Sequence, residues 1–366
     1  MNYNRIVIIG NGFDLALGLK TKFSDFLVWD FKRAIENYSR TYENDVFWRM
    51  KLNSPGLGQA LNSRIGKIRA LDEMQKIMDA CENVLKFSRS NEVERIVLRM
   101  VEQGWVDLEM LYYDLLIDAH QRELLESKLD RKYEQMLKVQ HLMSYLTKWI
   151  EEYIFEVQNS FSLNQNHFSM RDFLIGLTKT AKADLHGKIM VPNNTLLLNF
   201  NYTNTLERIL NFGQRTEDLE NSGVVLVNHI HGQVKDESNQ IIFGYGNDSG
   251  LDYEKLESEN YHELLQHMKS VRYTLSKNYH NLLNFLFERS FDVCVVGHSA
   301  GLSDSTLFST IFNHSNCRAV HLFHRGSKDS FLRLSISASR HFKNKSIYRE
   351  RMMPFDPDLK IPLVNQ

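Results

Sequence analysis

Hydrophobic positions along the chain follow two patterns, which predict two kinds of element. Between residues 65 and 161, apolar residues recur at three- and four-residue spacing with almost no glycine or proline. That spacing predicts several long amphipathic helices. Short unbroken apolar runs, typical of buried parallel strands, occur near residues 6–9, 195–200, 224–231, 241–246, 291–296 and 317–323. The sequence therefore predicts an α/β fold, in which a parallel sheet is interrupted by a large all-helical insertion.

The order of these patterns divides the chain into parts. Its length, 366 residues, suits one large or two ordinary domains. A further helical stretch is predicted over 253–289, between two of the strands. The expected domains are a sheet-containing core at 1–50 and 190–350, a helical insertion at 51–189 and an irregular tail at 351–366.

The first strand runs into a glycine turn. Gly10, Asn11 and Gly12 separate it from a helix-like run that begins at Phe13. Glycine lets the backbone approach a ligand closely, and amides at a helix start favour an anion such as pyrophosphate. Strand, glycine turn and helix open the nucleotide-binding sheets of the Rossmann type. The dinucleotide fingerprint is incomplete, since Leu15 replaces its third glycine, so a purely structural turn is the alternative.

Polar turns follow four of the predicted strands, at 10–14, 201–204, 229–232 and 297–304. Ligands of an open parallel sheet bind beyond the carboxyl ends of its strands, so we expect these turns to converge on one site.

Two side chains in these turns have the chemistry of a catalytic site. Asn201 can both donate a hydrogen bond to a ribose hydroxyl or a water and accept one. His231 can act as a base near neutral pH. Strand periodicity places it on one face with His229, and Gly232 favours a close ligand. A structural histidine at a strand end is the simpler alternative.

Net charge and cysteine content indicate which binding partners and which cellular compartment to expect. The formal net charge is −1, so bulk electrostatics favour neither nucleic acid nor an anionic membrane. The three cysteines, Cys81, Cys294 and Cys317, lack metal-ligand spacing and are expected to be buried thiols in a reducing compartment. No metal site is predicted. The chain shows neither a signal segment nor an apolar run of bilayer length, so a cytoplasmic location is expected.

A serine hydrolase is an alternative reading of one motif. Residues 297–301, Gly-His-Ser-Ala-Gly, match the G-x-S-x-G pattern of a nucleophile on a strand-to-helix turn, with Ser299 as the nucleophile. Few strands precede this motif and little chain follows it, which argues against the hydrolase architecture. Its triad partners would be drawn from Asp304, Asp329, His321, His324 and His341.

A pair of acids stands in the predicted insertion. Asp107 and Glu109 follow a break at Gly104, and at two-residue spacing they would not share a helix face. The simpler interpretation is that they stabilise a helix start through the helix dipole. The functional interpretation is an acid that reaches the nucleotide site.

Five motifs in this order resemble the AbiH family of bacterial abortive-infection proteins, which act against phage. They are IIGNGFDLALGLKTKFSDF, WVDLE, LNFNYTNTLE, HIHG and VGHSAGLSD, and they span nearly the whole chain. The AbiH family in turn resembles the SIR2-like domains of bacterial defence proteins, several of which destroy NAD during infection. The resemblance therefore implies a Rossmann-like (SIR2-like) parallel sheet and a site for NAD as substrate.

Matched position by position, the resemblance also implies roles. Gly10, Gly12 and Gly18 fall on the glycines of the first SIR2-like turn. Asn201 falls on the asparagine that orients ribose or water, and His231 falls on the catalytic histidine. Residues implied to contact the nucleotide in the late loop are Gly297, Ser299 and Asp304.

Two positions depart from the SIR2-like pattern. Asp14 replaces a small residue, and its carboxylate would repel a pyrophosphate unless it bonds ribose hydroxyls or a cation. Thr203 replaces an aspartate. The paired cysteines of a structural zinc are missing, so deacetylase activity is not expected. The candidate set is Asn201 and His231 for catalysis, with Gly10, Asn11, Gly12, Phe13, Asp14, Gly18, Thr203, Gly297, His298, Ser299 and Asp304 for binding NAD.

The sequence thus predicts an anti-phage protein that acts by nucleotide hydrolysis, with NAD glycohydrolase activity as the leading chemistry. A nucleotide-binding sensor without catalysis and a serine hydrolase are the alternatives. The expected partners are a nucleotide and a phage-derived trigger. Neither a membrane nor nucleic acid is expected, and the sequence leaves open whether the chain forms a homo-oligomer.

Overall fold

The structure is a computed structural model. It describes residues 3–41, 73, 108–126, 133–179, 182–183, 189–190, 192–212, 224–248, 250–259 and 261–362. The helices predicted over 65–107, Cys81, the break at Gly104 and Asp107 lie outside the described residues, apart from position 73.

The chain forms two compact units, each built from segments that are distant in sequence. The first unit comprises Met1–Lys20, Ile154–Glu254 and His267–Gln366. The second comprises Thr21–Tyr153 and Lys255–Gln266.

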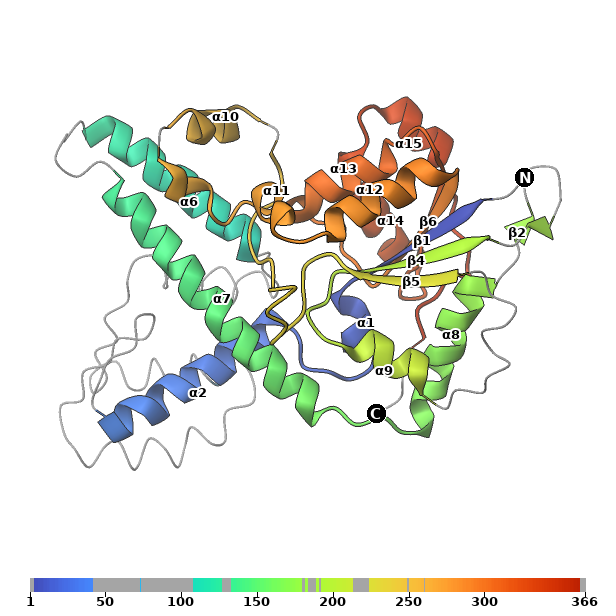
Figure 1. The fold of residues 1–366 in the computed structure, drawn as a ribbon, viewed down its shortest axis with the longest axis horizontal. Helices are drawn as coiled ribbons and strands as arrows, with labels where there is room; N and C mark the ends of the chain where they lie inside the picture. Colours follow the sequence, from blue (N-terminus) through green and yellow to red (C-terminus); the bar gives the residue numbers. More distant parts are fainter. Residues whose placement is uncertain are drawn as a thin grey trace. The chain divides into compact units, whose positions relative to one another are not determined.

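A five-stranded parallel sheet forms the centre of the first unit (Figure 1). The strand order is β5-β4-β1-β6-β7, and each neighbouring pair is parallel. The expected α/β class with a parallel sheet is confirmed. The strands are β1 (Asn4–Ile9), β4 (Asn194–Asn199), β5 (Val224–His229), β6 (Phe291–Val296) and β7 (Cys317–Leu322), while β2 (Lys182–Ala183) and β3 (Ile189–Met190) form a separate antiparallel pair.

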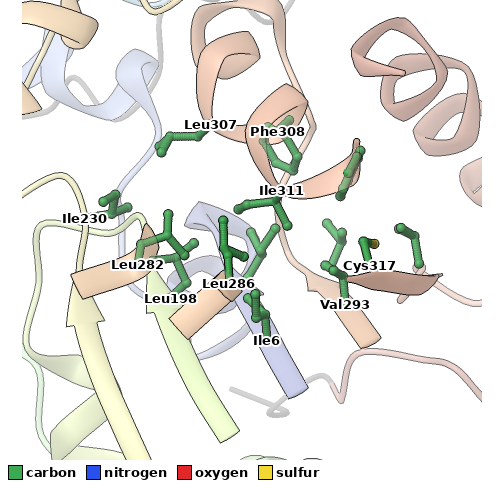
Figure 2. Packing of buried hydrophobic residues seen from close by; sticks show 14 of the residues in the cluster. Ile6, Leu198, Ile230, Leu282, Leu286, Val293, Leu307, Phe308, Ile311 and Cys317 are labelled. Atoms are coloured by element: carbon green, nitrogen blue, oxygen red, sulfur yellow. The ribbon is translucent and has the colours of Figure 1, made fainter. Parts of the chain in front are cut away.

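Helices cover both faces of the sheet because the strand residues alternate between two apolar clusters. Ile6 and Ile8 face a cluster that includes α12 (Asn278–Glu288) and α13 (Ser305–Phe312), part of which Figure 2 shows. Val7 and Ile9 face the opposite cluster. Burial on both faces explains why β1, β4 and β6 are continuous apolar runs, whereas residues 224–227 of the edge strand β5 are half-buried or exposed. The second cluster includes residues of α1 (Asn11–Ala16), α8 (Phe168–Lys179) and α9 (Thr205–Asn211).

The strand order fixes where a ligand can approach. From β1 the sheet grows to one side through β4 and β5, and to the other through β6 and β7. The turns that follow β1 and β6 therefore lie side by side where the direction of growth reverses. In open α/β sheets, this reversal opens a crevice outside the carboxyl ends of the strands.

The second unit is helical in its described part. Its helices are α2 (Phe23–Thr41), α6 (Leu108–Glu126) and most of α7 (Glu134–Ser160). Aromatic rings join α2 to α7, with Trp29 and Trp149 centroids 6.3 Å apart. Arg33 lies 3.5 Å from the centre of the Trp149 ring and pairs with the buried Asp30. Glu109 stands in the first turn of α6, where an acid favours the helix dipole.

One predicted strand is wrong. Residues 241–246 form no strand, and only an isolated bridge joins Tyr245 to Met268. A Cβ on Gly244 would stand 1.9 Å from the His267 carbonyl oxygen. The glycines that suggested a strand end therefore allow a close backbone crossing instead.

The helix predicted over 253–289 is broken into short pieces. The Lys269 amide donates to the Tyr245 carbonyl at 2.8 Å, so the backbone at Lys269 takes part in the crossing with residues 241–246. The pieces are α10 (Leu251–Ser258), the 3-10 helix η4 (His262–Leu265), α11 (Lys269–Arg272), η5 (Tyr273–Leu275) and α12. The remaining elements are η2 (Gln165–His167), η6 (Leu302–Asp304), α14 (Lys328–Ala338), η7 (Ser339–His341) and α15 (Lys345–Arg351).

Cys294 and Cys317 are buried free thiols, as predicted. Among the described helices, none combines the length and apolarity that crossing a membrane requires.

The fold makes glycine necessary at position 297, and Gly250 provides a matched control. Gly297 has φ +68°, and a Cβ there would stand 2.5 Å from the Phe13 nitrogen. Gly250 has φ +129° but no described atom within 4 Å of such a Cβ. We expect Gly297→Ala to lower the free energy of unfolding by about 2–5 kcal/mol, because strain and overpacking add. In urea denaturation, Gly250→Ala should lower the free energy of unfolding by a clearly smaller amount. Equal losses would show that the turn relaxes around the added methyl group.

Candidate functional site

The four predicted turns meet at the carboxyl edge of the sheet. The Gly12 amide donates to the Gly297 carbonyl at 2.7 Å. The Asn201 side-chain amide donates to the Gly10 carbonyl at 3.3 Å. His231, from the turn after β5, lies against Asp304 from the segment after β6. These contacts confirm that the turns after β1, β4, β5 and β6 converge.

The glycine turn after β1 has a packing reason for its composition. A Cβ on Gly10 would stand 2.6 Å from His298 Cα, and one on Gly12 would stand 2.7 Å from the Gly297 carbonyl oxygen. The amides of Gly10, Gly12 and Phe13 all donate to protein carbonyls. Two loops therefore pack here backbone to backbone. Asn11 begins α1 and is exposed, and the phosphate cradle proposed for this turn stays a prediction.

Gly18 ends the first helix. Its φ of +88° is left-handed, and its amide donates to the Leu15 carbonyl at 3.1 Å. The Leu19 amide then bonds the Asp14 carbonyl at 3.0 Å. This pattern closes a helix with glycine just past its end.

Asp14 is bound by hydroxyl groups of its own chain. Its side chain is buried, Thr203 donates to Oδ2 at 2.7 Å and Thr205 donates to Oδ1 at 2.5 Å. Burial raises the pKa of Asp14 to about 6, although both threonine hydroxyls act in the opposite direction. The carboxylate thus ties α1 to the start of α9, which gives a structural reason for both departures from the SIR2-like pattern.

The two histidines of the turn after β5 have separate partners. His229 Nε2 contacts the Glu207 carboxylate and, at 3.0 Å, the amide of Gln233. His231 Nε2 instead lies 3.1 Å from the Tyr273 hydroxyl. The strand ends at His229, so the two-residue period that predicted a shared face stops there.

A buried charged group forms around Asp304, and we call Asp304, Lys269, His231 and His298 the Asp304 cluster. Lys269 Nζ lies 2.6 Å from Asp304 Oδ1, and the lysine is fully buried. His231 Nε2 lies 3.3 Å from the same oxygen. His298 Nε2 lies 3.4 Å from Oδ2. One carboxylate therefore faces three basic side chains.

Charge and burial set the proton states of the Asp304 cluster. Burial alone would raise the pKa of Asp304, but Lys269, His231 and His298 hold it well below its usual range. Burial, and after it the Lys269 charge, lowers the pKa of His231 to about 3, although Asp304 acts in the opposite direction. At neutral pH the carboxylate is charged and the His231 imidazole is neutral.

Aromatic rings enclose this cluster. The Phe200 ring meets the edges of His231 and His298, with centroids 4.8 Å and 4.5 Å away. Tyr273 stacks on His231 with an interplanar angle of 12°. These ring contacts fix the orientation of the imidazoles.

Sequence reasoning missed Lys269, Tyr273 and Glu207. Lys269 and Tyr273 belong to the stretch predicted to be helical, where a single lysine or tyrosine carries no spacing signal. Glu207 follows Asn204 at the spacing of a helix capping box, yet neither side chain caps α9. In the structure, Glu207 contacts His229 instead.

A shallow depression of about 390 Å³ lies beside α9, and Glu207 is part of its lining. The second carboxylate oxygen of Glu207 is buried without a partner among the described residues. The other lining residues are Leu163, Asn204, Arg208, Asn211 and Phe212.

Ser299 lies on a tight, exposed turn. Gly297 and Ala300 have φ of +68° and +51° on either side of it. Within the described part of the chain, no hydrogen bond joins Ser299 to a histidine. The candidate partner His341 contacts Ser305 at 3.2 Å and the Ala300 carbonyl at 2.9 Å. The triad geometry of a hydrolase is therefore not formed around Ser299 by the described residues.

Fold and site together define an α/β protein with a buried charged cluster beyond the carboxyl ends of a parallel sheet. The chain belongs to the bacteriophage abortive infection AbiH family, whose model matches residues 6–325. Comparison with curated proteins gave no match.

Replacing Asp14 by asparagine should remove one source of pH-dependent stability. The pKa of Asp14 rises from 3.8 to about 6 on folding, so the folded state keeps a proton that the unfolded chain releases. The stability gained is present below the lower pKa and is lost as pH rises through the higher one. Between about pH 4 and about pH 7, the free energy of unfolding of wild type, measured in urea, should fall by up to roughly 3 kcal/mol relative to that of Asp14→Asn. A difference that is constant with pH would contradict this assignment.

The geometry around Ser299 predicts no reaction with a fluorophosphonate probe. Without a histidine to remove its proton, the hydroxyl is a weak nucleophile. Mass spectrometry of probe-treated protein should find Ser299 unmodified, with a known serine hydrolase as the positive control. Stoichiometric labelling that is lost in Ser299→Ala would restore the hydrolase alternative.

Proposed function

We propose that this protein acts in abortive infection against bacteriophage by binding and hydrolysing a nucleotide, with NAD as the substrate. The site is the carboxyl edge of the sheet, which we interpret as Rossmann-like and SIR2-like. The family supports the defence role. The observation that carries the chemical part is the buried Asp304 cluster, which adjoins the glycine turn where sheet growth reverses.

The strand order supports a dinucleotide site. Numbered along the chain, the five sheet strands stand in the order 3-2-1-4-5, which matches the first five strands of a classical dinucleotide-binding sheet. In such sheets the ligand lies across the turn after the first strand. Here that turn contacts Asn201 and packs against His298.

The proposed reaction uses groups that this edge already positions. Water replaces nicotinamide at the anomeric carbon through an oxocarbenium-like transition state. Asn201 holds the ribose or the water. His231 is neutral at physiological pH, so it can accept a hydrogen bond and a proton from a hydroxyl. Ser299, exposed at the edge, and Asp304 complete the proposed pocket.

A non-catalytic nucleotide sensor is the second candidate, and one observation favours it. His231 is buried beside the charged Lys269, and its pKa is therefore far below the value best suited to a general base. A site of this kind binds a nucleotide more readily than it turns one over. Ligand-dependent thermal stabilisation without turnover distinguishes the sensor from the enzyme.

Nicotinamide release from NAD tests the proposed activity. Purified full-length protein is incubated with NAD, with and without an extract of phage-infected cells. We expect release from wild type and also from His280→Ala, which changes an exposed histidine on α12 outside the site. In His231→Ala, the rate of nicotinamide release should fall about 100-fold or more, which is the usual contribution of a general base.

Two outcomes would overturn the catalytic proposal. One is no release from wild type even with infected-cell extract. The other is equal release from wild type and His231→Ala. Protection of cells against phage in a plating assay, measured with the same variants, shows whether turnover and defence are lost together.

A further inference from the structure

We propose that Lys269 and Asp304 are positioning residues that hold the proton of His231 on Nε2, so that Nδ1 is the atom presented to the nucleotide. The proposal rests on the proposed function and adds which atom of the site accepts the hydrogen bond. It also gives a role to Lys269, which no motif predicted.

The chemistry of a carboxylate decides which nitrogen is protonated. An ionised carboxylate can only accept hydrogen bonds. Asp304 Oδ1 already accepts from Lys269 Nζ at 2.6 Å, and the lysine charge favours the ionised form. His231 Nε2 lies 3.3 Å from that oxygen, and its contact with the carboxylate is favourable only when Nε2 carries the proton. In a neutral imidazole, Nδ1 then holds a lone pair.

The neighbouring histidine shows the same arrangement independently. His298 Nδ1 accepts a hydrogen bond from the Ala300 amide at 3.0 Å, so its proton must reside on Nε2. That nitrogen faces Asp304 Oδ2 at 3.4 Å. The two oxygens of one carboxylate therefore orient two imidazoles.

Every titratable group that faces His231 is consistent with this state. Lys269 comes from α11, Tyr273 from η5, and His298 and Asp304 from the segment after β6. The Tyr202 ring lies 6.5 Å away, centroid to centroid. The Tyr273 hydroxyl approaches Nε2 at 3.1 Å, on the nitrogen that Asp304 also faces. Within the described residues, no hydrogen bond engages Nδ1.

The lysine is held in place by backbone. Its amide donates to the Tyr245 carbonyl at 2.8 Å. Gly246 leaves room for its stem, since a Cβ there would stand 3.1 Å from Lys269 Cδ and 2.6 Å from the Ser303 carbonyl oxygen. The Thr306 amide donates to the Gly246 carbonyl at 2.7 Å. Segments before and after the lysine thus fix the ammonium group on Asp304.

Removing the lysine charge changes the expected proton state. With Lys269 charged, Asp304 ionised and both histidines neutral, the Asp304 cluster has no net charge. Without the lysine the same state leaves an uncompensated buried carboxylate, which is costly. Uptake of a second proton by His231 restores neutrality, and that proton occupies Nδ1.

Nitrogen NMR of the histidine rings in full-length protein tests this directly. Protein labelled with nitrogen-15 at histidine is titrated from about pH 5 to about pH 8, the range in which an ordinary histidine changes charge. His231 is assigned from its missing signal in His231→Gln. In wild type, we expect a neutral ring with the proton on Nε2 throughout. In Lys269→Met, we expect His231 to gain its second proton within this range, because without the lysine charge its pKa rises from about 3 to about 5 or higher.

Controls separate charge from packing. Lys343→Met removes an exposed lysine from the same unit and should leave the His231 signals unchanged. Lys269→Arg keeps the charge and should retain the wild-type tautomer. If Lys269→Met does not fold, the wild-type tautomer and Lys269→Arg still decide the question.

The outcomes distinguish this proposal from the proposed function. A proton on Nδ1 in wild type, or an unchanged titration in folded Lys269→Met, overturns the positioning role even if NAD is hydrolysed. The expected tautomer in a protein that neither binds nor hydrolyses NAD supports the positioning geometry and overturns the proposed function instead.

Discussion

The close backbone contact between the turns after β1 and β6 is the constraint on which the site depends. Gly12 and Gly297 approach so closely that neither position can carry a side chain without displacing the other. Parallel strands at the reversal of the sheet must start their connections next to each other, and only glycine makes so short a separation possible. The contact sets His298 beside Gly10, and His298 in turn faces Asp304. The contact between the two turns therefore requires glycine at these positions, and a ligand that approaches the backbone closely favours glycine for the same reason.

Two buried carboxylates at this edge are stabilised in different ways. Asp14 is surrounded by hydroxyl groups, which lower the cost of its charge only in part, so its pKa stays raised. Asp304 has a lysine at 2.6 Å and two imidazoles, and its pKa is lowered. A hydroxyl supplies a dipole, whereas an ammonium supplies a full charge in a poorly screened place. The first arrangement suits a structural tie, and the second maintains a permanent charge beside the place proposed for a ligand.

Sequence patterns gave the sheet and the meeting of its turns, because both follow from local rules. Unbroken apolar runs identified β1, β4 and β6, which are buried on both faces, and strand direction placed their ends together. Patterns failed at the crossing of residues 241–246 over the segment at Lys269. There, glycines and apolar residues serve a contact between distant segments, which no local periodicity records. Lys269 was missed for the same reason, since a single buried lysine is recognisable only from the carboxylate beside it. The threonine partners of Asp14 stand almost two hundred positions later, so no local pattern could predict its contact with them.

The chain connection between the two units has a mechanical consequence for the Asp304 cluster. Residues Lys255–Gln266 belong to the helical unit, and the sheet unit resumes at His267. Lys269 follows two residues later, with its amide bonded to Tyr245 and its ammonium on Asp304. The covalent link from the helical unit thus ends almost at the ion pair. A displacement of the backbone at Gln266 therefore has only two residues, His267 and Met268, in which to be absorbed before it reaches Lys269.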